Sequence, residues 1–69
     1  MRVKINGKTE EIRETTLSAL LKARNIEPQM VTVELNAKML DRASIGQTSL
    51  HEGDEIEFLY FMGGGSATF

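Results

Sequence analysis

The sequence of 69 residues has no cysteine and no tryptophan, and only one proline and one histidine. Without cysteine it offers no disulfide, no thiolate nucleophile and no thiolate metal ligand. A multi-histidine metal site is excluded because His51 is the single histidine. Its neighbours Glu52 and Asp54 are typical of a tight turn, so we interpret His51 as a solvated turn residue. We therefore expect no catalytic side chain, no metal and no bound cofactor.

Long apolar runs and an excess of positive charge are also missing. The net charge is −2 at pH 7, whereas nucleic-acid binding depends on clustered Lys and Arg that neutralise phosphates. No apolar run approaches the ~20 residues that a membrane-spanning helix needs. The first residues, Met1 to Asn6, alternate in polarity and lack the apolar stretch of a signal peptide. We expect a cytoplasmic protein that binds neither nucleic acid nor membrane.

The N-terminal residues predict a β-hairpin. The pair Asn6-Gly7 is typical of a type I′ turn, in which both central residues have positive φ. A two-residue turn would place Val3 opposite Glu10, whereas a four-residue loop from Asn6 to Thr9 would place Val3 opposite Ile12. We favour the longer loop because it pairs an apolar residue with an apolar residue.

A short helix follows the hairpin. Thr15-Thr16 provides an N-cap hydroxyl, and Asn25 can end the helix in the left-handed conformation. Pro28 prevents the helix from resuming. The apolar residues of this segment recur at helical spacing and predict one buried stripe: Leu17, Leu20 and Leu21.

The rest of the chain predicts further strands and turns. The expected segments are a strand at 30–35, a turn at 36–38, a short edge strand at 39–41, a turn at 52–54 and a last strand at 55–61, with Ile45 and Leu50 as buried anchors. The expected fold is α+β, a mixed sheet of four to five strands with one helix packed across it. The last strand is the most apolar, so we place it in the middle of the sheet, beside the first strand.

The outer face of the last strand predicts a surface for a partner. If Ile56 and Phe58 point into the core, then Leu59 and Phe61 point outward. Together with Met62 they would form an exposed apolar patch, and such patches often mark a partner interface. Tyr60 would continue the inner row at its rim.

Gly63-Gly64-Gly65 comes directly after this strand. Glycine removes the side chain and accepts conformations closed to other residues, so this run predicts a thin flexible tail that can thread an enzyme channel too narrow for a Cβ atom. We divide the chain into a domain at 1–62 and a tail at 63–69. The tail includes the four-residue extension Ser66-Ala67-Thr68-Phe69.

In combination, several of these segments resemble the ubiquitin-like sulfur carrier proteins of thiamine and molybdopterin biosynthesis, which have the β-grasp fold. The resemblance covers the chain to Gly65. The segments that carry it are Ile5-Asn6-Gly7, Leu17-Ser18-Ala19-Leu20-Leu21, Val31-Thr32-Val33-Glu34-Leu35-Asn36, Glu52-Gly53-Asp54-Glu55-Ile56 and the glycine run.

The resemblance implies that the reactive group is the C-terminal carboxylate of Gly65, with Gly63 and Gly64 inside the partner's active site. An adenylyltransferase of the ubiquitin-activating type would use ATP and Mg to form an acyl-adenylate, and sulfur would then displace AMP to leave a thiocarboxylate. For the thiamine carriers the acceptor is thiazole synthase. The extension Ser66 to Phe69 departs from the family pattern. Either a processing protease removes it, as a metalloprotease of the deubiquitinase type does for some sulfur carriers that this chain resembles, or the tail is inactive, or this member does something else.

Three alternatives stay open at this point. The chain could carry sulfur for another pathway, such as molybdopterin or amino-acid synthesis. It could be a ubiquitin-like modifier that is joined to lysines of other proteins. It could also be a binding module that uses only the face of its sheet, in which case the tail would be dispensable.

Overall fold

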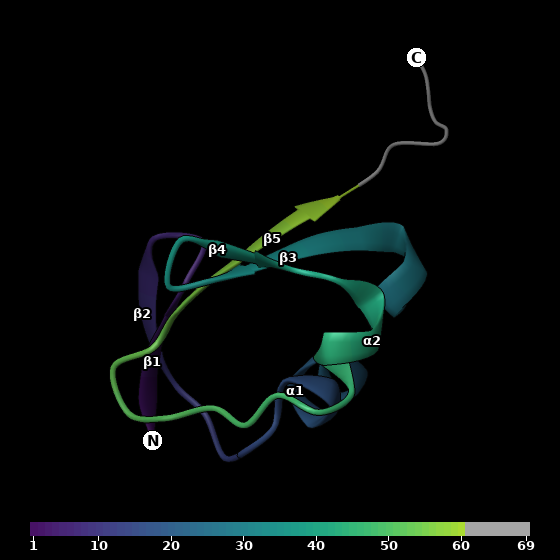
Figure 1. Cartoon of the computed structure of the whole chain (residues 1–69). Helices are drawn as coiled ribbons and strands as arrows, with labels where there is room; N and C mark the ends of the chain where they lie inside the picture. Colours follow the sequence, from purple (N-terminus) through teal and green to yellow (C-terminus); the bar gives the residue numbers. More distant parts are fainter. Residues whose placement is uncertain (61–69) are drawn as a thin grey trace.

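The structure is a computed structural model that describes residues 1–60. One sheet contains five strands in the order β2-β1-β5-β3-β4. The strands are β1 (Arg2–Ile5), β2 (Lys8–Glu11), β3 (Val31–Leu35), β4 (Lys38–Leu40) and β5 (Glu55–Tyr60), and the helices are α1 (Leu17–Ala23), the 3-10 helix η1 (Pro28–Met30) and α2 (Arg42–Ile45). Figure 1 shows α1 and α2 on the same side of the sheet, so within residues 1–60 no helix covers its other face. The predicted two-layer β-grasp fold is confirmed.

Strand β5 occupies the middle of the sheet, as predicted. It runs parallel to β1, with Ile5 opposite Ile56, and antiparallel to β3, with Val33 opposite Phe58. Both apolar side chains of its inner row, Ile56 and Phe58, are buried. A strand with neighbours on both sides and a helix over one face needs such an apolar row, which explains why the most apolar strand is central.

The N-terminal hairpin has the two-residue turn, so the preference for a four-residue loop was wrong. Val3 lies opposite Glu10. Asn6 (φ 50°) and Gly7 (φ 83°) both adopt the left-handed conformation, which matches the twist of the two strands. The local conformational preference of Asn6-Gly7 therefore decided the register.

Ile12 is buried without lying opposite Val3. It comes just after β2, where its N–H donates to the Met1 carbonyl at 2.8 Å and the Met1 ammonium donates to the Ile12 carbonyl at 2.8 Å. Glu10 shares the helix side of the sheet with Val3 and forms an ion pair with Arg24 at the end of α1. Glu10 thus has an ion-pair partner, so the two-residue turn can place it on the helix side of the sheet.

Both ends of α1 were predicted correctly. The Thr16 hydroxyl accepts a hydrogen bond from the Ala19 N–H at 3.2 Å. At the other end Asn25 has φ 59°, and the Ile26 N–H donates to the Leu21 carbonyl at 2.9 Å. This is the Schellman arrangement, which satisfies carbonyls that the helix leaves unpaired.

Helix α2 was not predicted, and β4 lies one residue earlier than the expected segment 39–41. Asn36 and Ala37 form a tight turn, so Asp41 falls after β4 and becomes the N-cap of α2. Hydrogen bonds from Ser44 lower the pKa of Asp41, the one from its side chain more than the one from its backbone N–H. Ile45 is buried by this helix.

The core lies between the sheet and the helices and includes Ile45 and Leu50, as predicted. Its buried side chains are Val3, Ile5, Ile12, Leu17, Leu20, Leu21, Val31, Val33, Ile45, Leu50, Ile56 and Phe58. No helix among residues 1–60 has the length and apolar character to cross a membrane.

The turn between β3 and β4 generates a prediction. Ala37 has φ 70°, a conformation that costs an L-residue about 1–2 kcal/mol. Replacing it with glycine removes this strain but increases the entropy of the unfolded chain, so Ala37→Gly should raise the free energy of unfolding by about 0.5–1 kcal/mol. Urea unfolding measures the change. The control Ala19→Gly, inside α1, should lower stability by about 1 kcal/mol, and no gain at Ala37 would contradict the assigned backbone conformation.

Candidate functional site

Most of the predicted site lies outside the described residues: Phe61, Met62, Gly63, Gly64 and Gly65. The structure describes the end of β5 from which these residues continue. The domain boundary predicted at residue 62 also falls outside the described residues. The site is therefore built here from the surface around Tyr60.

The side chains of β5 alternate as expected up to its last described residues. Ile56 and Phe58 are buried, whereas Leu59 is 47% exposed and Tyr60 is 54% exposed. Leu59 lies opposite Thr32 on the face that no helix covers. The outward direction of Leu59 is confirmed, and its role at a partner interface stays a prediction.

Met30 belongs to the same surface and was missed by sequence reasoning. It directly precedes Val31, which lies opposite Tyr60, and Met30 itself is 48% exposed. We call Met30, Leu59 and Tyr60 the exit surface. The register of β3 against β5 would have indicated Met30, because it places Val31, the next residue in the chain, opposite Tyr60.

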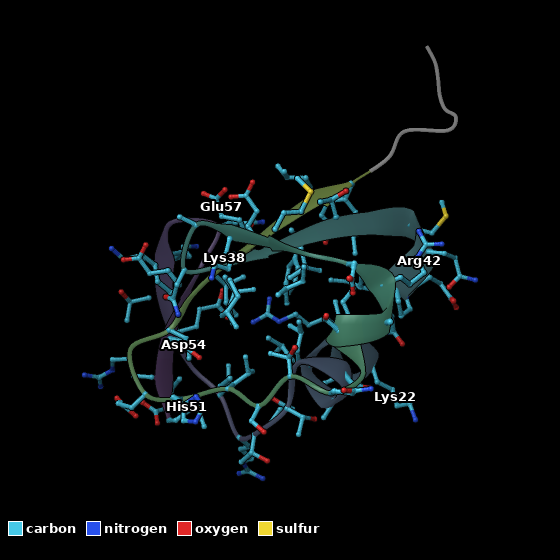
Figure 2. All side chains as sticks on the ribbon, in the orientation of Figure 1. Lys22, Lys38, Arg42, His51, Asp54 and Glu57 are labelled. Carbon is cyan, nitrogen blue, oxygen red and sulfur yellow. The ribbon has the colours of Figure 1, made fainter. Side chains whose placement is uncertain are left out.

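Strands β3 and β5 carry a cluster of glutamates on the uncovered face, next to the exit surface. Glu34 lies directly opposite Glu57, an arrangement in which like charges repel. Glu55 borders the same shallow depression as these two residues. Figure 2 shows Glu57 on the side of the sheet away from α1 and α2. This face suits a partner surface that carries positive charge.

Two turn asparagines hold β5 from opposite sides. The Oδ1 atom of Asn6 accepts from the Phe58 N–H at 2.8 Å, and the Oδ1 atom of Asn36 accepts from the Glu55 N–H at 2.9 Å. Each asparagine directly follows a strand, and each has positive φ. In this conformation its side chain reaches the backbone of β5. The central strand is thus tied at both ends by side chains as well as by its ladders.

His51 lies in the segment that precedes β5, away from the exit surface. Its side chain is exposed, and its Nδ1 atom is 3.9 Å from Oδ2 of Asp54. The His51 backbone N–H donates to the same carboxylate at 2.8 Å. This geometry is that of a turn stabilised by Asp54, as predicted. Within residues 1–60 no group of His, Asp and Glu is arranged to hold a metal ion.

Comparisons with known proteins agree with this geometry. A profile of the ThiS family matches residues 3–65. The crystal structure of the thiamine biosynthesis protein ThiS from Geobacter metallireducens has a TM-score of 0.79 and 40% identity, covering 94% of this chain and 100% of that one. The solution structure of a thiamine biosynthesis protein from the same organism gives 0.77 and 37%, covering 100% and 94%.

Two curated relatives are longer proteins named thiazole synthase. The one from Magnetococcus marinus is 36% identical over 66 residues, which are 94% of this chain and 20% of that protein. The one from Paramagnetospirillum magneticum is 33% identical over 67 residues, 96% of this chain and 21% of that protein. The chain thus spans about a fifth of the length of these relatives. Because the family profile matches nearly all of it and a solved member shares its fold over its whole length, the chain belongs to the ThiS family of ubiquitin-like sulfur carrier proteins.

Proposed function

We propose that the chain carries sulfur for the thiazole ring of thiamine and acts as a protein co-substrate rather than as an enzyme. The reactive group is the carboxylate of Gly65, set free by removal of residues 66–69. The observation that carries the proposal is the family match, which runs from β1 through the glycine run and stops at residue 65. The named activity of the solved relatives, thiamine biosynthesis, supports the pathway.

The chemistry explains why a carrier needs no catalytic side chains. A carboxylate is a poor electrophile until one of its oxygens is part of a good leaving group. The partner adenylyltransferase transfers AMP from ATP to the carboxylate and releases pyrophosphate, with Mg supplied at the partner's site. A nucleophile at the oxidation level of hydrogen sulfide then attacks the acyl carbon, the bond from that carbon to the AMP oxygen breaks, and a thiocarboxylate and free AMP remain.

The described residues would contribute binding and presentation. Leu59 and Tyr60 offer apolar surface at the root of the tail, and Glu57 adds negative charge beside it. A partner that covers this surface gains orientation of the tail, since apolar anchors at the centre of an interface supply most of its binding energy. Gly63 and Gly64 would lie inside the partner's channel, because a channel too narrow for a Cβ atom still admits glycine.

Thiazole synthase is the acceptor that we propose. Two relatives bear that name and contain a region similar to nearly the whole of this chain. This favours thiamine over molybdopterin or amino-acid synthesis as the receiving pathway. A processing protease is part of the proposal, because with Ser66 to Phe69 attached no glycine carboxylate is free.

Formation of the thiocarboxylate is directly measurable. The chain ending at Gly65 is incubated with its adenylyltransferase, Mg-ATP and a sulfur source. Its intact mass should rise by the difference between a sulfur and an oxygen atom, whereas the chain ending at Phe69 should not change. Unchanged mass of the Gly65 form would contradict the proposal. Adducts of higher mass on denaturing gels would instead favour the modifier alternative.

Leu59→Glu tests the partner interface. Leu59 is 47% exposed, so the substitution should leave the unfolding midpoint nearly unchanged. It places a charge where an apolar anchor is expected, and kcat/KM for adenylation of the Gly65 form should fall about tenfold or more. Thr9→Glu is the matched control, because it adds the same charge to the same face on the outer strand β2. Equal effects of the two substitutions would rule out a localised interface at Leu59.

A further inference from the structure

Strand β5 continues beyond the end of its parallel neighbour. The pairing of β1 with β5 ends at Ile5 opposite Ile56, whereas β5 runs on to Tyr60. The last residues of β5 therefore have β3 on one side but, among residues 1–60, no strand on the other. This half-open segment is the root of the proposed reactive tail.

Asn6 takes over where β1 ends. Its backbone N–H donates to the Ile56 carbonyl at 2.9 Å, and its Oδ1 atom accepts from the Phe58 N–H at 2.8 Å. The side chain thus adds one further rung to the parallel ladder. The φ of 50° at Asn6 turns the backbone away while its side chain stays beside β5.

No later contact of this kind exists on that side of β5 within residues 1–60. Backbone groups of a strand point alternately to its two neighbours, so Phe58 and Tyr60 both direct their N–H groups toward the β1 side. The Tyr60 N–H has no partner among the described residues. The Asn6 contact with Phe58 is therefore the last tie on this side before the tail.

We propose that Asn6 is a positioning residue for the reaction at the tail. Its side chain holds the backbone of β5 at Phe58, close to the point where the chain continues toward the tail. A tail that starts from an ordered root loses less conformational freedom on entering an enzyme channel, and the free energy of binding improves accordingly. This inference rests on the proposed function, since it concerns the same tail.

Asn36 supplies a matched control. Its Oδ1 atom accepts from the Glu55 N–H at 2.9 Å, and its Nδ2 atom donates to Oδ1 of Asp54 at 3.0 Å. It performs on β5 the same task as Asn6, but at the beginning of the strand. A substitution by glycine there removes the comparable hydrogen bond to β5, and the bond to Asp54 with it, without loosening the root of the tail.

The test uses chains ending at Gly65 with Asn6→Gly, Asn6→Asp or Asn36→Gly. Glycine keeps the left-handed turn and removes the acceptor, whereas aspartate keeps an acceptor. Asn6→Gly should raise KM for adenylation about three- to tenfold, the equivalent of one hydrogen bond, with kcat unchanged because the fully bound state is the same. Both Asn6→Asp and Asn36→Gly should keep the KM of the unsubstituted chain.

Hydrogen exchange provides a second readout that does not depend on activity. The Phe58 amide should exchange faster in Asn6→Gly but not in Asn36→Gly, although both variants lower the unfolding midpoint. An unchanged KM in Asn6→Gly, or an equal rise in Asn36→Gly, would overturn this proposal alone. A wild-type chain that does not react would overturn the proposed function, and this proposal with it.

Discussion

The burial of the inner row of β5 is the constraint on which the rest of the structure depends. Ile56 lies between β1 and β3, Phe58 lies beside β3, and both side chains are buried in the core. Full burial of such a side chain stabilises by about 1.5–3 kcal/mol, and a chain of this size is stable by only a few kcal/mol in total. The strand that leads to the tail is therefore also the strand that holds the domain together.

This coupling suits the proposed chemistry. The tail begins at the best-anchored strand, so a force or a binding event at the tail acts on the centre of the sheet rather than on a loosely held edge. The uncovered face beside it carries Leu59 for apolar contact and Glu57 for charge complementarity. In the function that we propose, the partner supplies the reaction and this domain supplies the surface by which the partner recognises it.

Much of the fold could be predicted from the sequence because the determinants are local. Thr16 and Asn25 mark the ends of α1, and both were found from residue type alone. The position of β5 followed from its apolar row. The hairpin register was missed because the turn preference of Asn6-Gly7 opposes the pairing of Val3 with another apolar residue. The shorter turn places Glu10 in the inner row, where its ion-pair partner is Arg24, a residue outside the hairpin.

The candidate site was less predictable for a related reason. The exit surface includes Met30, which no motif marks and which joins Tyr60 only through the register of β3. Asn6 was noted as a turn former, but its bond to Phe58 spans 52 positions in the chain. Contacts of this kind arise from topology, so residue type and spacing do not indicate them.

The central claim is that a folded domain presents an activated glycine end to another protein. The intact mass of the protein isolated from its own cells tests this most directly. The account predicts a population that ends at Gly65, part of it carrying sulfur in place of one carboxylate oxygen. A population that always retains Ser66 to Phe69 and never carries the additional sulfur would contradict it.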